Sequence, residues 1–126
     1  MKKRILVIDD EELLTKTFAR LLEKRNFDVL VASHPDDALA MIEEEKFDLV
    51  LCDIRMPGKN GIETMLEIRS LLQEKGIAEL PVIFLTGFAD EESQRKATSL
   101  RPIAYISKPF DTLKLLGMIE STLAAA

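Results

Sequence analysis

Five short runs of apolar, often β-branched residues recur along the chain, and segments with helical periodicity separate them. The runs are residues 5–8, 29–32, 49–53, 81–85 and 103–106. A continuous apolar run bounded by turn residues is typical of a strand buried on both faces. Strands that alternate with helices predict βαβ crossovers and a parallel sheet covered on both sides. We expect an α/β fold with a doubly wound sheet of five parallel strands and five helices.

The intervals between the strands carry apolar residues spaced for one face of a helix. This spacing predicts helices over residues 11–25, from 38 to about 45, from 62 to about 75, over 90–100 and from about 112 onward. The first helix is expected to end at Asn26, and Asn60 and Asp111 are expected to cap the third and the last. The buried face of the last helix is expected to carry Leu113, Leu116, Ile119 and Leu123.

Composition limits the classes of function that remain open. The chain has 126 residues, of which 47% are apolar, so we expect one domain with a full core. The net charge of −5 and the absence of a basic block after the first four residues argue against direct binding of nucleic acid, because a duplex binder needs a cationic face. No apolar run is long enough to span a bilayer. Together with a single cysteine, Cys52, which we expect to be buried, this favours a cytoplasmic protein that does not bind membranes.

Polar side chains with a common chemistry stand where four of the strands end. Asp9 and Asp10 follow the first strand, Asp53 ends the third, Thr86 the fourth, and Lys108 follows the fifth. The carboxyl ends of parallel strands meet at one edge of a sheet, so these side chains could converge. Three carboxylates repel one another unless a cation joins them, and oxygen ligands suit Mg²⁺ or Mn²⁺. A lysine and a hydroxyl beside them would bind a phosphoryl group.

Each of these residues also has an ordinary structural explanation. Asp53 could form a turn, Thr86 could cap a helix, and Lys108 could be a solvated loop residue. Acids are favourable at a helix N-terminus, and Glu11 and Glu12 fit that explanation well. Residues 33–36 are expected to form a loop with an exposed histidine. Because the polar residues recur at successive strand ends, a phosphoryl-transfer site is the favoured interpretation.

Four motifs at these strand ends resemble those of one known family. They are 7–11 (Val-Ile-Asp-Asp-Glu), 53–61 (Asp-Ile-Arg-Met-Pro-Gly-Lys-Asn-Gly), 85–87 (Leu-Thr-Gly) and 105–110 (Tyr-Ile-Ser-Lys-Pro-Phe). In this order and spacing, residues 4–123 resemble a receiver domain of the two-component response regulators, which have a flavodoxin-like fold. The resemblance implies a phosphorylation-dependent signalling switch, and no enzyme beyond assistance to its own phosphorylation and dephosphorylation.

The resemblance also implies which residues hold the metal and the phosphoryl group. Asp53 would accept the phosphoryl group from a phosphohistidine of a sensor histidine kinase or phosphotransfer protein. Mg²⁺ would be bound by Asp10, by Asp53 and by the backbone carbonyl of Arg55, and by Asp9 through a water molecule. The phosphoryl oxygens would be bound by Thr86 and Lys108, whose bond to Pro109 is similar to one that is usually cis.

The same resemblance implies an output surface. Thr86 and the aromatic residue Tyr105 would act as the switch. They would change a face made by the helix at 90–100, the strand at 103–106 and the last helix, which an effector domain, a partner protein or a second copy would read. Arg55 and Phe88 stand where the family tunes the lifetime of the phosphoryl group. Asn60 replaces a usual aspartate, and the residues at 101–102, Arg-Pro, replace a usual Gly-Ala.

Three other functions compete with this interpretation. A Mg²⁺-dependent phosphatase with an aspartate nucleophile would place that residue after the first strand and would need a substrate cap. A flavodoxin-like cofactor binder would need a phosphate loop where Asp9 and Asp10 stand, and these acids would repel a phosphate. A receiver fold used only for interaction would not need the complete set of Asp10, Asp53, Thr86 and Lys108.

Overall fold

The computed structural model describes residues 2–55, 60–78, 80–87 and 90–124, in which five strands alternate with five helices. The strands are β1 (Arg4–Ile8), β2 (Asp28–Ala32), β3 (Leu49–Asp53), β4 (Val82–Thr86) and β5 (Ala104–Ser107). The helices are α1 (Glu12–Lys24), α2 (Pro35–Glu44), α3 (Gly61–Glu74), α4 (Glu91–Ser99) and α5 (Thr112–Ala124). All strand pairs are parallel in the order β2-β1-β3-β4-β5, which confirms the expected doubly wound sheet.

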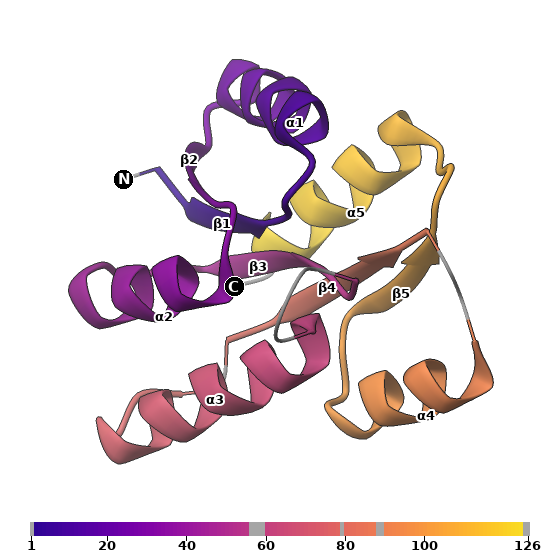
Figure 1. The fold of residues 1–126 in the computed structure, drawn as a ribbon. Helices are drawn as coiled ribbons and strands as arrows, with labels where there is room; N and C mark the ends of the chain where they lie inside the picture. The colour runs from indigo at the N-terminus through magenta and orange to yellow at the C-terminus, as the bar shows by residue number, and fades with distance from the viewer. Residues whose placement is uncertain (1, 56–59, 79, 88–89, 125–126) are drawn as a thin grey trace.

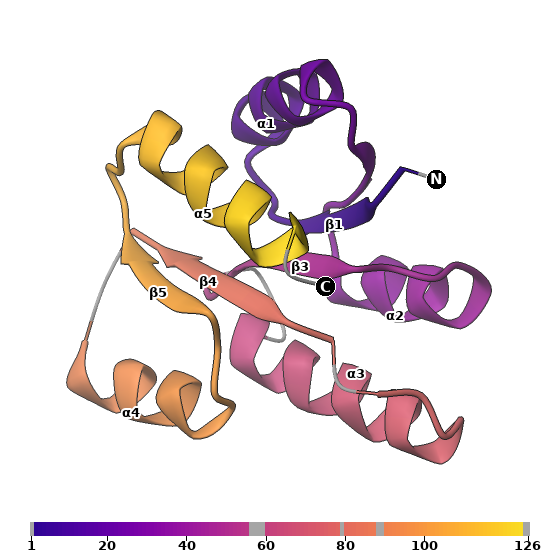
Figure 2. The ribbon, with the colours of Figure 1, turned by 180° about the vertical axis from the view of Figure 1, so that it is seen from behind.

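Helices cover both faces of the sheet. Helices α1 and α5 lie on one face, and α2, α3 and α4 lie on the other (Figures 1 and 2). Each face has its own apolar core, one containing Phe18, Leu22 and Ile119 and the other Met65, Ile68 and Ala97. The three central strands are almost completely buried, whereas the edge strands β2 and β5 are half-buried. Within the described residues, no helix is long and apolar enough to cross a membrane.

The expected helix ends are confirmed where side chains or backbone angles define them. Asn60 accepts a hydrogen bond from the backbone N–H of Glu63, and the Glu63 side chain accepts one from Asn60 N–H, which forms a capping box at α3. Asn26 follows α1 with φ of 70°, as expected for a helix end. Asp111 accepts hydrogen bonds at one carboxylate oxygen from the N–H groups of Leu113 and Lys114.

Two expectations about the helices are wrong. Residues 33–36 are not all loop, because α2 begins at Pro35, and exposed His34 caps it by accepting the N–H of Asp36 at Nδ1. Proline suits the first helical position, because the N–H group that it lacks would have no intrahelical partner there. On α5, Leu113 is 71% exposed and Leu115 is buried in its place. At 3.6 residues per turn, Leu113 points in a direction outside the stripe that the buried residues of α5 share.

The turn after α4 forms despite the unusual residues at 101–102. Arg101 follows the helix with φ of 53°, a region that favours glycine. An L-residue in this conformation costs about 1–2 kcal/mol. The Arg-Pro sequence therefore keeps the turn that glycine would make more easily, and Ile103 then hydrogen-bonds through its N–H to the carbonyl of Val82 beside β4.

Candidate functional site

The parallel sheet brings the polar strand ends to one edge. Strands β1, β3, β4 and β5 are consecutive neighbours, and Asp9, Asp53, Thr86 and Lys108 lie at or just after their carboxyl ends. Backbone hydrogen bonds fix two of these positions across the strands. The N–H of Lys108 donates to the carbonyl of Thr86 at 2.7 Å, and that of Ile54 donates to the carbonyl of Leu85 at 3.0 Å. The convergence expected from the sequence is therefore present.

Three carboxylates meet at this edge. Asp9, Asp10 and Asp53 each offer one oxygen, and these oxygens all lie within 4.8 Å of one another. Asp9 and Asp53 are buried, whereas Asp10 is exposed. One oxygen of Asp53, Oδ1, is buried without a hydrogen-bond partner among the described residues. A hard divalent cation with several water ligands fits this set, because it would supply both the missing partner and the missing positive charge.

The surroundings of Asp53 disfavour its ionised form. Its pKa is raised from 3.8 to about 6. Burial is the largest cause, and the negative charges of Asp9 and Asp10 add to it, while Lys108 and the backbone N–H of Arg55 act in the opposite direction. Strongly shifted groups of this kind are concentrated at functional sites.

Lys108 is the cation of the cluster. Its Nζ lies 3.3 Å from Asp9 Oδ2 and 3.7 Å from Asp53 Oδ2, and its side chain is 16% exposed. Burial lowers its pKa, but the charge of Asp9, a hydrogen bond to Glu11 and the charge of Asp53 outweigh burial, so the pKa is raised. The ammonium is therefore charged and close to the carboxylate that would carry a phosphoryl group.

Three of the remaining predicted residues lie on β4, on β5 and just beyond β3. Thr86 is completely buried at the end of β4. Tyr105 is half-buried on β5, and its hydroxyl is buried without a hydrogen-bond partner in the described part of the chain. Burial and the charge of Asp90 raise the pKa of Tyr105. Arg55 is exposed just beyond β3, and its carbonyl remains a predicted ligand. Phe88 lies outside the described residues.

Other expectations near the site have mixed outcomes. Cys52 is buried, as expected, and burial raises the pKa of its thiol, which disfavours the reactive thiolate form. The Lys108–Pro109 bond is cis. The expectation for Glu11 was incomplete: it stands at the N-cap of α1, yet its side chain makes no capping hydrogen bond within the described structure and lies 3.1 Å from Lys108 Nζ. The acidic run at 9–12 was the only sequence signal for this contact.

Comparison with known proteins points to one family. The family model of the response regulator receiver domain matches residues 5–120. A CheY-like response regulator receiver domain protein from Methanospirillum hungatei is 30% identical, with a TM-score of 0.89 over 99% of this chain and 96% of that one. The N-terminal domain of a response regulator/sensory box/GGDEF 3-domain protein from Carboxydothermus hydrogenoformans is 29% identical, with a TM-score of 0.82 over 98% and 95% of the two chains. The chemotaxis protein CheY4 of Vibrio cholerae, 23% identical, shares the fold with a TM-score of 0.85 over 97% and 99%.

Proposed function

The chain belongs to the response regulator receiver domain family of two-component signalling, and we propose that Asp53 is its phosphoryl acceptor. The donor would be a phosphohistidine of a sensor histidine kinase or phosphotransfer protein. The observation that carries this proposal is the meeting of a buried aspartate, two further aspartates and one lysine at the carboxyl edge of the sheet. Receiver domains act in general as signalling switches and not as enzymes with a separate substrate.

The transfer step uses Asp53 as a nucleophile. One carboxylate oxygen attacks the phosphorus, the bond from phosphorus to the imidazole nitrogen breaks, and its electron pair stays on the imidazole. The product is an acyl phosphate. Lys108 offsets the negative charge that collects on the phosphoryl oxygens, and the Thr86 hydroxyl donates a hydrogen bond to one of them. The backbone hydrogen bond between these two residues fixes the positions from which their side chains extend.

We propose that Asp10, Asp53 and the Arg55 carbonyl hold Mg²⁺ or Mn²⁺, with Asp9 acting through water. When bound, the ion would neutralise the carboxylates and share in binding the phosphoryl oxygens. The support is the three-carboxylate cluster and the unpartnered Asp53 oxygen beside it. Asp53 would then be fully ionised and ready to attack at neutral pH.

Replacement of Asp10 with Asn is expected to weaken Mg²⁺ binding about tenfold or more. The change removes one of the charges that attract the ion, and a loss of about 1.4 kcal/mol corresponds to a factor of ten. Isothermal titration of Mg²⁺ into both proteins measures this. Asp37→Asn is the matched control, because Asp37 is an exposed acid in the first turn of α2 and is not one of the three clustered carboxylates. Equal affinity of the Asp10 variant and wild type would exclude Asp10 as a ligand.

The proposed output is a change at the face made by α4, β5 and α5. Thr86 and Ser107 are register partners on β4 and β5, and Tyr105 is paired in the same way with Phe84. Movement of the Thr86 hydroxyl toward a phosphoryl group would therefore change the packing beside Tyr105. An effector domain, a partner protein or a second copy of the chain could read the altered face, since a partner that prefers one state shifts the balance.

Phosphoryl transfer from acetyl phosphate tests the proposed function. We expect wild-type protein with Mg²⁺ to gain the mass of one phosphoryl group and to gain none in excess EDTA. Borohydride reduction of the acyl phosphate followed by peptide mass spectrometry locates the modified residue. A modification on any residue other than Asp53, or equal labelling with and without the metal, would refute the proposal.

A further inference from the structure

Lys108 is held most closely by Glu11 and not by the proposed phosphoryl acceptor. Its Nζ lies 3.1 Å from Glu11 Oε1, 3.3 Å from Asp9 Oδ2 and 3.7 Å from Asp53 Oδ2. The first two contacts are hydrogen bonds, whereas the third is an ion pair of longer range. The Glu11–Lys108 pair also joins the loop before α1 to the loop before α5, two segments 97 residues apart.

The Glu11 side chain is not used to cap its own helix. Its backbone N–H donates to Asp9 Oδ1 at 2.9 Å, so Asp9 fixes the loop. The Glu11 carboxylate makes no capping hydrogen bond among the described residues and reaches toward Lys108 instead, although its side chain is 61% exposed. An exposed glutamate that only favoured the helix N-terminus would not need this contact.

Packing keeps the Lys108 stem within reach of both carboxylates. Phe18 of α1 stacks on Phe110, with ring centroids 5.5 Å apart. Both rings line a groove of about 260 Å³ whose lining also includes Glu11 and Lys108. The stack ties the chain beside Lys108 to α1, so the ammonium can change partner by rotation of the side chain alone.

We propose that Glu11 is a latch that competes with residue 53 for the Lys108 ammonium until a phosphoryl group is present on Asp53. This inference rests on the proposed function. The Asp53 carboxylate has one negative charge, whereas a phosphoryl group carries about −1.5 to −2. Phosphorylation therefore strengthens the attraction of Lys108 to residue 53, while the exposed and screened attraction to Glu11 is unchanged. Glu11 is a positioning residue that opposes the phosphorylated state and is released when that state forms.

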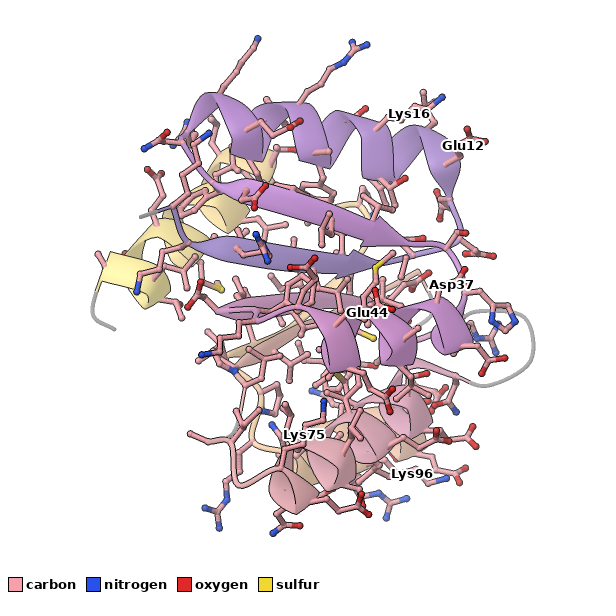
Figure 3. The ribbon with its side chains drawn as sticks, turned by 90° about the vertical axis from the view of Figure 1, so that its left-hand side faces the viewer. Glu12, Lys16, Asp37, Glu44, Lys75 and Lys96 are labelled. Carbon is pink, nitrogen blue, oxygen red and sulfur yellow. The ribbon has the colours of Figure 1, made fainter. Side chains whose placement is uncertain are left out.

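Binding of beryllofluoride, which mimics the phosphoryl group, tests the latch. At Mg²⁺ concentrations that saturate each protein, Glu11→Gln is expected to tighten beryllofluoride binding about two- to fivefold, the range of one exposed ion pair. Glu12→Gln is the matched control. Glu12 is the next residue, and its carboxylate pairs with Lys16 on the outer side of α1 at 3.2 Å (Figure 3). The control removes the same charge without touching Lys108, so its affinity is expected to stay close to that of wild type.

A second measurement follows the latch directly. The carboxyl ¹³C signal of Glu11 in wild type is expected to move on addition of beryllofluoride toward its position in ligand-free Lys108→Met, where the pair is absent. A signal that does not move, or equal affinities of Glu11→Gln and Glu12→Gln, would overturn the latch. Failure of wild type to bind beryllofluoride, in contrast, would count against Asp53 as the acceptor. The two proposals therefore fail in different ways.

Discussion

Asp53→Asn is expected to abolish labelling by acetyl phosphate and, at the same time, to make the metal-free protein more stable at neutral pH. Labelling is lost because an amide cannot act as the oxygen nucleophile. Stability rises because the folded state must ionise a carboxyl group that is buried beside two other acids. The carboxylate that the chemistry requires therefore destabilises the metal-free folded state.

The direction of this stability change follows from the number of protons that the folded and the unfolded states bind. The pKa of Asp53 is about 6 in the folded protein, against 3.8 as the usual value. Between these pH values the folded state binds more protons than the unfolded state, so the stability of wild type falls as pH rises through this window. Asn has no charge to bury. At pH 7.5 the Asp53→Asn variant is therefore expected to have a free energy of unfolding about 2–3 kcal/mol higher than that of wild type.

Denaturant unfolding of both proteins from pH 3.5 to 7.5 measures the gain. We expect it to vanish near pH 3.5 and to shrink on addition of Mg²⁺, which stabilises wild type by binding its folded state. Asp37→Asn, an exposed acid on α2, is expected to be labelled normally and to unfold like wild type. Labelling of Asp53→Asn, or a variant less stable than wild type at pH 7.5 without metal, would contradict this account.

Gly61→Ala is expected to lower the free energy of unfolding by about 4 kcal/mol or more, in the range reserved for severe steric conflict. A Cβ at residue 61 would lie 2.1 Å from the carbonyl oxygen of Asp53 and 2.8 Å from Cys52 Sγ. Gly61 begins α3 and donates its N–H to the carbonyl of Ile54 at 2.8 Å, so the helix start is bound closely to the end of β3. Relief of the clash would displace Asp53 itself.

Gly117→Ala in α5 provides the control of opposite sign. A Cβ there would meet no described atom within 4 Å, and alanine is favoured over glycine inside a helix by about 0.5–1 kcal/mol. Guanidinium unfolding monitored by circular dichroism compares the two variants, and acetyl phosphate labelling reports on the site. If Gly61→Ala unfolds within 1 kcal/mol of wild type, the close approach of α3 to β3 is not required for the fold.

Much of this protein could be predicted from short-range signals. The order of apolar runs and amphipathic segments predicted the five strands, the five helices and the parallel sheet. A strand buried on both faces leaves a continuous apolar run, whereas a helix buried on one face leaves apolar residues at helical spacing. Asn26, Asn60 and Asp111 marked helix ends because their effect is local. Strand order then placed the predicted side chains at one edge, since parallel strands end on the same side. The functions of those residues remain predictions.

Only the tertiary structure decided which side chains touch. The sequence placed Glu11 at a helix start, but its contact with Lys108 depends on a distance between residues far apart in the chain. The raised pKa of Asp53 likewise comes from burial and from neighbours on other strands. Leu113 is exposed because the direction of a helix toward the sheet is set by packing and not by the apolar residues alone. Periodicity and caps are local properties, whereas contacts and pKa values depend on how the whole chain packs.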